Sequence, residues 1–498
     1  MAAEGPGDPP ADDANLQLGR AVGRGLRWSL FSTALARLGA LVSGIVLARL
    51  LEPTDYGLYT VAFVALVLLA NINDIGLETT LVRWPVDVAT VARTATTVIF
   101  GASVLLFGAA FFAAPFLARS LRAPEAAGII RLLAFCVVVN GAFAVPSAML
   151  TRSFRQDKRA AADVAGFVLS TAVTIALAVA GYGAWSLAWG RLVGNLANGL
   201  LHLALAPARY RPGFDAGDAR KLVSAGLPIA GALLTATAVY NIDYVIVGRY
   251  IGPAALGLYV MAFNLSSWPV SMFTESVGRV SVAGFARLQL DLPSLRAAFT
   301  RSLTLLMAAA VPVCVLVAVL ADPLVRFVYG DRWSPAAQAL RFLIVLGLIR
   351  VAFHLAYDLL VAVGRGRAAL GLHLLWLAAL VPALAVGTRA GGIRGAGIAH
   401  MAVAATVVLP ALLVLLRGLG FRVTDLARSV ARPVAGGLVA AAVALGGLRL
   451  VTPELAQLAV AGTLGLGAYL LVVAPLRHRP ELRLRRPGPR QPVAVEPA

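Results

Sequence analysis

The sequence predicts an all-α polytopic membrane protein built from two homologous halves. Three observations predict it: the composition, a series of long apolar segments, and a turn motif that occurs twice. Of the 498 residues, 59% are hydrophobic and only 13% are charged, and the mean hydropathy is +0.83. Soluble proteins carry about 25% charged residues. We therefore expect most of the surface of this chain to face lipid.

Fourteen apolar segments are long enough to cross a hydrocarbon core of about 30 Å, which takes about 20 helical residues. We expect these membrane helices at residues 26–51, 57–80, 92–118, 127–151, 161–181, 184–207, 222–250, 256–281, 297–320, 335–363, 368–388, 393–416, 429–449 and 455–475.

The basic residues support this count, because cytoplasmic loops of membrane proteins carry an excess of arginine and lysine. With the N-terminus in the cytoplasm, the cytoplasmic segments hold 29 arginine and lysine residues and the opposite side holds nine. The excess alternates loop by loop, which predicts fourteen helices with both termini in the cytoplasm. The net charge of +19 is thereby explained by membrane orientation, and we expect no nucleic-acid partner.

A helix–turn–helix motif is written twice, 200 positions apart and without a gap. Residues 47–63 read LARLLEPTDYGLYTVAF, and residues 247–263 read VGRYIGPAALGLYVMAF. The first copy contains Arg49, Pro53, Gly57 and Tyr59, and the second contains Arg249, Pro253, Gly257 and Tyr259. Such a duplication indicates two homologous halves, and in transporters the halves enclose the substrate site.

The repeat and one polar linker set the expected domains. Because six helices separate the copies, both halves start on the same side of the membrane, so the repeat is parallel rather than inverted. We expect a disordered cytoplasmic tail at 1–19, a lobe of helices one to six at 20–207, a cytoplasmic linker at 208–221, a lobe of helices seven to twelve at 222–416, helices thirteen and fourteen at 417–476, and a basic cytoplasmic tail at 477–498.

Five stretches carry a resemblance to a known family. They are RGLRWSLFSTALARLGALVSGIVLARLLEPTDYGLYTVAF at residues 24–63, DIGLETTLVR at 74–83, TRSFRQDKRA at 151–160, GYGAWSL at 181–187 and YGDRWSPAAQALRFL at 329–343. The chain resembles the Wzx-type oligosaccharide flippases, which are polysaccharide transporters of the MOP superfamily, over about residues 20–475.

That resemblance implies a MATE/MOP-like fold of two pseudo-symmetric lobes in the plasma membrane. It implies translocation of an undecaprenyl-pyrophosphate-linked oligosaccharide from the inner to the outer leaflet. It also implies coupling to a membrane potential or to an H+ or Na+ gradient, with polysaccharide polymerases or glycosyltransferases of the same pathway as possible partners.

Moving such a lipid-linked sugar requires a polar cavity with cations for the phosphates, and polar residues at membrane depth are the candidates. In the first helix, Ser29, Thr33 and Arg37 follow at intervals of four, and Arg37 lies close to the midplane of the membrane. A guanidinium offers five donors suited to phosphate oxygens. The alternative is that Arg37 pairs with a carboxylate or a helix end between helices.

Further candidates lie in later helices. We expect Arg191, Asn241, Asp243, Asn264 and Ser271 to line the cavity, with Glu275 at the cytoplasmic end of the polar stripe that holds Asn264 and Ser271. Packing between helices is the alternative role for such polar side chains, and the sequence leaves it open.

Arg350, His354 and Asp358 follow at intervals of four in the tenth helix and form the densest group of ionisable residues within the membrane. Arginine and aspartate on either side of an imidazole would suit a proton-coupling relay, and Glu275 is a further coupling candidate. A structural network that packs this helix against a neighbour explains the same pattern.

The repeated arginines, Arg49 and Arg249, end their helices at the extracytoplasmic surface. A cation there can bond the last carbonyls of a helix, so we favour a capping role over a role in cargo release. We expect Tyr59 and Tyr259 in the aromatic belt at the membrane interface.

No catalytic pattern is present, so we do not expect an enzyme. The sequence has no GxxxxGK[ST] loop for nucleotide hydrolysis, its five histidines lack metal-ligand spacing, and we expect no cofactor. A polymerase or ligase of lipid-linked glycans would need a large extracytoplasmic loop. A MATE-like cation-coupled drug exporter and a non-transporting membrane scaffold remain as alternatives.

Overall fold

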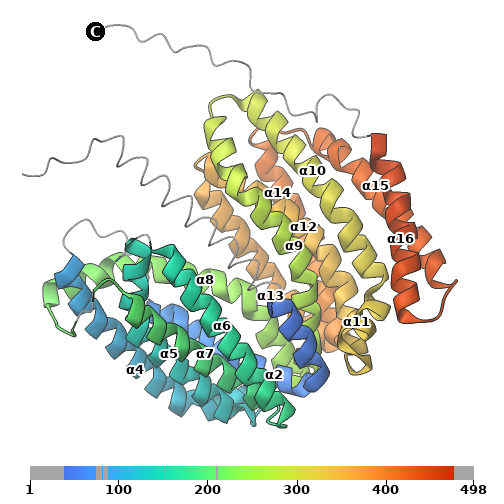
Figure 1. The fold of residues 1–498 in the computed structure, drawn as a ribbon. Helices are drawn as coiled ribbons and strands as arrows, with labels where there is room; N and C mark the ends of the chain where they lie inside the picture. The colour runs from blue at the N-terminus through green and yellow to red at the C-terminus, as the bar shows by residue number, and fades with distance from the viewer. Residues whose placement is uncertain (1–38, 75–80, 82–87, 154, 209–210, 476–498) are drawn as a thin grey trace, which may run out of the picture. The chain divides into compact units, whose positions relative to one another are not determined.

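The computed structural model describes residues 39–475 apart from 75–80, 82–87, 154 and 209–210 (Figure 1). The described residues form helices and no strand, which confirms the all-α fold class. The elements are Gly39–Leu50, α2 (Pro53–Asp74), α4 (Val88–Ser120), α5 (Ala126–Arg152), α6 (Gln156–Val179), α7 (Ala184–Leu205), α8 (Ala216–Ile251), α9 (Pro253–Arg287), α10 (Leu292–Val319), α11 (Ala321–Tyr329), η1 (Asp331–Ala336), α12 (Ala337–Ala362), α13 (Gly366–Val403), η2 (Ala404–Val408), α14 (Leu409–Arg417), α15 (Val423–Leu448) and α16 (Glu454–Val473).

Every segment predicted from 57–80 onward overlaps one of these helices. By length and apolar composition, nine spans in the described part of the chain could cross a membrane. One of the nine, Gly366–Arg417, contains two of the predicted segments, because α13 bends where Gly391 and Gly392 leave the helical conformation. The multi-pass membrane character is therefore established, while the count of fourteen stays a prediction.

The structure also contains elements that the apolar pattern did not predict. The short helix α11 lies between the segments predicted at 297–320 and 335–363, and the 3-10 turn η1 precedes α12 and overlaps the second segment at 335–336. The sequence of α11 carries Asp322 and Arg326, so it is too polar to be read as part of a membrane span.

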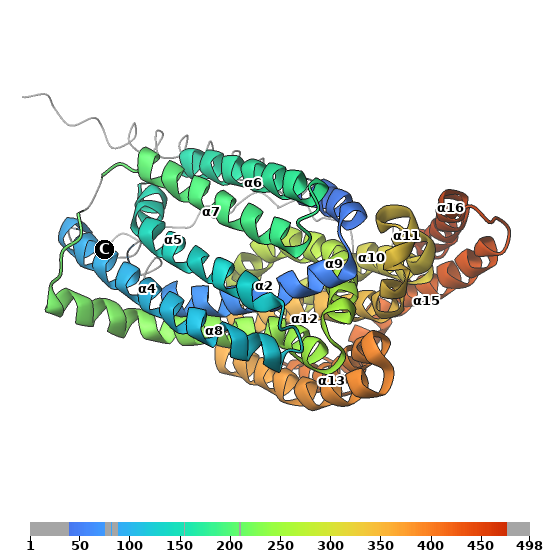
Figure 2. The same ribbon diagram turned by 90° about the horizontal axis from the view of Figure 1, so that it is seen from below.

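The described helices form two compact units. Unit 1 contains residues up to Met261 together with Val328–Ala336 and Leu384–Ala396, and unit 2 contains the remainder. Within unit 1, α6 packs against α7, and α5 packs against α4, α7 and α2 (Figures 1 and 2). Within unit 2, α10 packs against α12 and α15, and α15 packs against α16. The lobe boundaries predicted from the sequence stay a prediction.

The duplicated motif starts a helix in each copy. Both α2 and α9 begin at the repeated proline, and proline suits the first helical position because its missing N–H has no partner there in any case. Gly252 has a φ of +85°, which ends α8 one residue before Pro253. In the first copy the Asp55 carboxylate accepts the Glu52 N–H at 3.0 Å and the Ala184 N–H at 3.0 Å. Asp55 therefore fixes the start of α2 to the start of α7.

The two copies of the motif touch each other within unit 1. A Cβ atom placed on Gly57 would overlap the carbonyl oxygen of Pro253, and one placed on Gly257 would overlap the carbonyl oxygen of Pro53. The first turns of α2 and α9 therefore cross at backbone distance, which only glycine permits at these two positions. The repeated glycines are thus explained by a reciprocal helix crossing.

Reciprocal hydrogen bonds lie beside this crossing. Nη1 of Arg332 donates to the Leu51 carbonyl at 3.5 Å, and Nη1 of Arg122 donates to the Tyr250 carbonyl at 3.2 Å. Each arginine thus bonds a carbonyl at the end of the apolar segment of the other half of the sequence. Carbonyls at the end of a helix have no hydrogen-bond partner within that helix. The two arginines supply a donor to one such carbonyl in each copy of the motif.

Trp333 anchors η1 on the first copy of the motif. Its side chain is fully buried, its Nε1 donates to the Ala48 carbonyl at 2.7 Å, and its ring meets the Tyr56 ring edge-on at 5.3 Å. The 3-10 turn is therefore held by both a hydrogen bond and aromatic packing.

We expect Trp333→Ala to lower the free energy of unfolding by about 3–5 kcal/mol, because it removes a buried indole. Trp333→Phe should cost about 1–3 kcal/mol, because the ring is kept and only the buried Ala48 carbonyl loses its donor. Thermal unfolding in detergent measures both effects. Trp189→Phe is the control, since Trp189 is 41% exposed; an equal shift at Trp189 would contradict the anchoring role.

Candidate functional site

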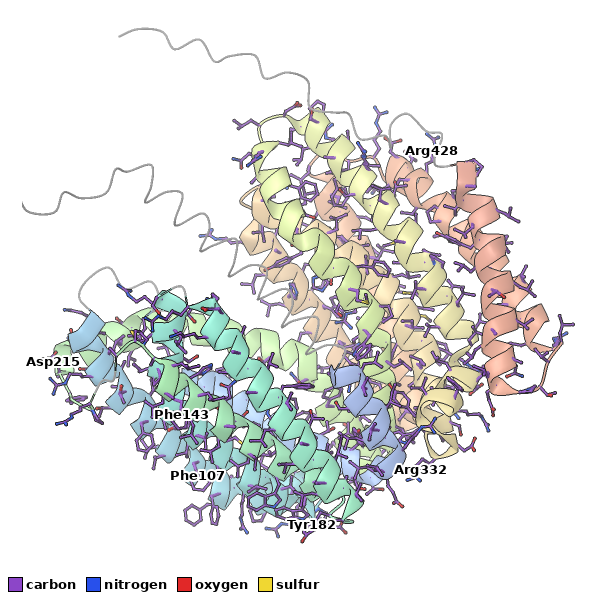
Figure 3. The ribbon with its side chains drawn as sticks, viewed as in Figure 1. Phe107, Phe143, Tyr182, Asp215, Arg332 and Arg428 are labelled. Carbon is purple, nitrogen blue, oxygen red and sulfur yellow. The ribbon has the colours of Figure 1, made fainter. Side chains whose placement is uncertain are left out.

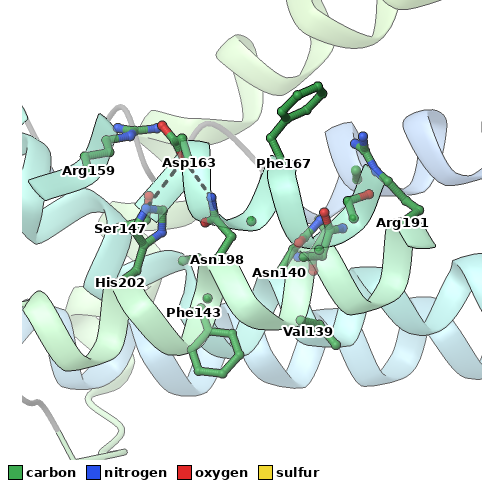
Figure 4. Close-up of a pocket in the computed structure, with 18 of the residues that line it drawn as sticks. Val139, Asn140, Phe143, Ser147, Arg159, Asp163, Phe167, Arg191, Asn198 and His202 are labelled. Atoms are coloured by element: carbon green, nitrogen blue, oxygen red, sulfur yellow. Dashed lines mark hydrogen bonds and ion pairs between the residues drawn. The ribbon is translucent and has the colours of Figure 1, made fainter. Parts of the chain in front are cut away.

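A polar cavity of about 550 Å³ lies within unit 1 (Figure 4). Its walls come from α2, α4, α5, α6 and α7. The volume falls in the range of about 300–1,000 Å³ that is usual for small-molecule sites. Its polar lining residues are Asn71, Asn73, Asn140, Ser147, Arg159, Asp163, Ser170, Arg191, Asn195, Asn198 and His202.

Glycines bring two walls of this cavity together. A Cβ on Gly166 of α6 would lie 2.9 Å from the Cβ of Asn198, and a Cβ on Gly194 of α7 would lie 3.0 Å from the Gly166 carbonyl oxygen. Gly190 meets α6 in the same way, so that its Cβ would lie 2.8 Å from the Ser170 carbonyl oxygen. Gly190 and Gly194 form a small-xxx-small pattern, which lets two membrane helices pack closely. This packing places polar residues of α6 and α7 beside each other.

Asp163 of α6 joins two residues of α7. Its Oδ1 accepts a hydrogen bond from Asn198 Nδ2 at 2.7 Å and lies 3.7 Å from His202 Nε2 (Figure 4). The His202 side chain is buried, while the Asp163 side chain is 53% exposed. The carboxylate therefore faces the open part of the cavity and the imidazole lies deeper.

Two buried polar atoms on the cavity wall have no hydrogen-bond partner within the described structure. They are Asn73 Oδ1 and His202 Nε2. The distance of 3.7 Å from His202 Nε2 to Asp163 Oδ1 is too long for a hydrogen bond. A buried polar group without a partner costs about 1–3 kcal/mol. Both residues line the cavity, so two polar groups without a partner lie in its wall.

The predicted cavity residue Arg191 lines this cavity. Its guanidinium lies over the ring of Phe63 at 5.7 Å from the ring centroid, an arrangement that stabilises a cation next to apolar surface. With Arg159 and Arg191 as cations and Asp163 as the carboxylate, the described lining has two positive charges and one negative charge. The cavity therefore has a small excess of positive charge.

Other predicted site residues fall in different places. Ser29, Thr33 and Arg37 lie outside the described residues, and nothing is described of the Glu275 side chain. Asp243 is 2% exposed and accepts the hydroxyl of Tyr259 at 3.1 Å.

The remaining predicted residues of this group make local contacts or are exposed. Asn241 and Ser271 donate to carbonyls of their own helices at 2.8 and 2.9 Å, while Asn264 is exposed. None of the three lines the cavity of unit 1. Their assignment to a substrate site stays a prediction.

The two arginines of the repeat have different surroundings. The Nε of Arg49 donates to the carbonyl of Val328 at 3.4 Å, and Val328 belongs to α11 rather than to the helix that holds Arg49. Arg249 is exposed. Tyr259 is fully buried within the protein, and its predicted position in the interface belt stays a prediction. Its bond to Asp243 supplies the polar partner that a buried tyrosine hydroxyl needs.

Three of the four predicted coupling residues, Arg350, His354 and Asp358, share one face of α12 in unit 2. Arg350 lies over the ring of Phe263, with its guanidinium 5.4 Å from the ring centroid. Phe263 is the residue of the second motif copy that corresponds to Phe63. His354 meets Phe353 edge-on at 6.4 Å. Among the described residues, no ion pair or hydrogen bond joins Arg350, His354 and Asp358, so the relay role stays a prediction.

The pair of Asp163 and His202 was missed from the sequence, although a signal for it exists. Asp163 is the sole acidic residue in the segment 161–181, and His202 lies in the segment 184–207. Ionisable residues at membrane depth mark functional sites by default. The spacing could not show that they meet, because they lie on different helices.

Comparisons with known proteins support the resemblance drawn from the sequence. The chain is 25% identical over 382 residues to the lipopolysaccharide biosynthesis protein WzxC of Escherichia coli (strain K12), covering 74% of this chain and 76% of the relative. It is 23% identical over 350 residues to the teichuronic acid biosynthesis protein TuaB of Bacillus subtilis (strain 168), covering 68% and 71%.

Solved structures show the same fold. The lipid II flippase MurJ in an inward closed conformation matches with a TM-score of 0.76 at 13% identity, covering 92% of this chain and 100% of that one. An inward-facing MATE family transporter of the MOP superfamily matches with a TM-score of 0.59 at 18% identity, covering 77% and 95%. The model of the family described as "Polysaccharide biosynthesis protein" matches residues 46–338, and the chain belongs to this family.

Proposed function

We propose that this protein moves an undecaprenyl-pyrophosphate-linked oligosaccharide from the cytoplasmic to the outer leaflet of the plasma membrane. The observation that carries the proposal is the cavity of unit 1, in which amides and two arginines line a space formed by five helices. Family membership and the names of the relatives support the same substrate class.

The chemistry of the cavity suits part of a glycolipid head group. Amide side chains both donate and accept hydrogen bonds, as sugar hydroxyls do, and the lining contains Asn71, Asn73, Asn140, Asn195 and Asn198. Arginine binds phosphate oxygens through its planar fork of N–H groups. Arg191 and the predicted cavity residue Arg37 would hold the pyrophosphate, while the polyprenyl chain stays in lipid.

Transport would proceed by alternating access of the two six-helix halves predicted from the sequence, with both termini in the cytoplasm. Arg350, His354, Asp358 and Glu275 are the candidates for coupling to H+ or Na+, or for sensing the membrane potential. A polysaccharide polymerase or the glycosyltransferases of the pathway are the partners that this role implies. No catalytic step by this chain is part of the proposal.

A MATE-like drug exporter is the second candidate, because a MATE transporter shares the fold. A site for cationic drugs favours aromatic side chains and carboxylates over arginine. The described lining holds Arg159 and Arg191 against one carboxylate and the rings of Phe143 and Phe167, which supports the flippase. A non-transporting scaffold would not require a cavity with buried unpartnered polar atoms.

The test is reconstitution into liposomes with a fluorescent polyprenyl-pyrophosphoryl oligosaccharide, with and without an imposed membrane potential. We expect transfer to the outer leaflet only with the protein present, and loss of transfer in Arg37→Ala with membrane insertion intact. Efflux of a cationic dye without lipid transfer would indicate the exporter, and activity on neither would indicate the scaffold. Wild-type flux in Arg37→Ala would remove Arg37 from the site.

A further inference from the structure

A second cavity lies within unit 2, at the start of α15. It has a volume of about 790 Å³ and is formed by α10, the turn that ends at Arg422, and the first two turns of α15. Four arginines line it: Arg296, Arg301, Arg422 and Arg428. With Asp425 as the carboxylate of the described lining, four positive charges minus one negative charge leave a net charge of +3.

One of these arginines is held in place by the backbone. The Nε of Arg296 donates to the Leu419 carbonyl at 3.2 Å. Its guanidinium lies against Gly420, whose φ is +81° and at which a Cβ would overlap Nη2 of Arg296. The turn thus uses a glycine both for its left-handed conformation and for the close approach of the arginine.

The floor of this cavity is apolar and fixed. Phe421 is 6% exposed and meets the ring of Phe299 at 5.1 Å, and Leu426 is 5% exposed. By contrast, Arg428 has an 82% exposed side chain and lies only 3.9 Å from Asp425 in a pair that is open to solvent. An ion pair that is exposed to solvent contributes little to stability, so Arg428 can turn to an anion at small cost.

The position of the cavity points to a membrane lipid. The segments predicted at 297–320 and 429–449 place Arg296 and Arg428 at the boundary between lipid and water, and Arg428 lies in the second turn of α15 (Figure 3). The excess of arginine and lysine assigns this boundary to the cytoplasmic side. The N-terminus of α15 adds a partial positive charge at the same place.

We propose that this cavity binds the phosphate of an anionic lipid in the cytoplasmic leaflet. Basic pockets between membrane helices recognise lipid head groups of this kind, and guanidinium groups match phosphate oxygens. The cavity is far larger than one ion, since a water molecule takes about 30 Å³, so it has room for a phosphate and its glycerol. An anionic phospholipid is the expected source.

This site is separate from the cavity of unit 1 and does not depend on transport. Binding can therefore be measured in a protein that moves nothing. A protein that does not bind the lipid at this site could still carry out the proposed translocation. A protein that carries out no translocation could still bind the lipid here.

Native mass spectrometry of the detergent-solubilised protein tests the proposal by titration with phosphatidylglycerol or phosphatidylethanolamine. We expect phosphatidylglycerol to bind at least tenfold more tightly than the zwitterionic lipid. The double variant Arg422→Gln/Arg428→Gln should weaken phosphatidylglycerol about thirtyfold, because each basic residue near an anionic lipid contributes about a factor of five. Both side chains are on the surface, so we expect the fold to be retained.

The control is Arg367→Gln/Arg417→Gln, which removes the same charge from two exposed arginines that do not line the cavity. An equal loss in the control would overturn the proposal in favour of diffuse surface charge. Displacement of the phospholipid by polyprenyl pyrophosphate would support the site and make the lipid carrier its occupant. Displacement by inorganic phosphate at the same concentration would overturn the lipid assignment.

Discussion

Replacement of Arg191 by alanine is expected to lower lipid-linked oligosaccharide transfer at least tenfold in the liposome assay, while expression and membrane insertion stay normal. Arg191 brings a guanidinium to the cavity wall and lies over Phe63 at 5.7 Å. Hydrogen bonds from charged groups contribute about 1.5–3 kcal/mol, and 1.4 kcal/mol corresponds to a factor of ten. Loss of this one cation should therefore lower the rate by at least that factor.

The matched control is Arg131→Ala. Arg131 lies over the ring of Phe111 at 4.7 Å and donates to the Phe111 carbonyl at 3.2 Å, but it does not line the cavity. Its loss removes an arginine–phenylalanine pair of the same kind from the same unit. If Arg131→Ala and Arg191→Ala reduce transfer equally, the cavity role of Arg191 is excluded.

Arg191→Lys separates charge from geometry. Lysine keeps the positive charge but lacks the planar fork that binds phosphate through two parallel hydrogen bonds. We expect an intermediate rate for this variant if Arg191 contacts phosphate. Full recovery would indicate that only the charge matters.

Replacement of Gly57 by alanine is expected to destabilise the protein by about 2 kcal/mol or more, because the new methyl group would overlap the Pro253 carbonyl oxygen. Overpacking of a close contact costs about 1–3 kcal/mol, and here the neighbouring atom belongs to the backbone and cannot rotate away. Gly257→Ala should have a similar effect, since its methyl group would overlap the Pro53 carbonyl oxygen. Thermal unfolding in detergent measures both.

Gly108→Ala is the control, because Gly108 lies inside α4 and a Cβ there meets nothing within 4 Å. This variant should be neutral, or more stable by up to about 1 kcal/mol from helix propensity. The double variant of Gly57 and Gly257 should cost less than the sum of the single variants, because both act on one crossing. Strict additivity would mean that the two glycines do not meet.

Much of the fold could be predicted from the sequence, because each membrane helix corresponds to a long apolar segment. The helices α2 and α9 start at Pro53 and Pro253, four and three residues before the segments predicted at 57–80 and 256–281, because proline suits the first helical position. The short helix α11 could not be predicted in this way, because nine residues with Asp322 and Arg326 give no membrane signal.

The candidate site was predictable only in part. Arg191 stood out as a cation within an apolar segment, and it does line the cavity. Asp163 and His202 were not identified as cavity residues, because only the close packing of α6 against α7 brings them together beside Asn198. That packing depends on glycines, whose effect appears only when the neighbouring helix is known.

The reciprocal crossing of Gly57 and Gly257 explains why the two copies of the motif align without a gap. An insertion of one residue between the proline and the glycine would rotate the glycine by about 100° around its helix and off the crossing. A change of length in one copy would need an immediate compensating change in the other. The crossing therefore requires the two turns to keep a common length.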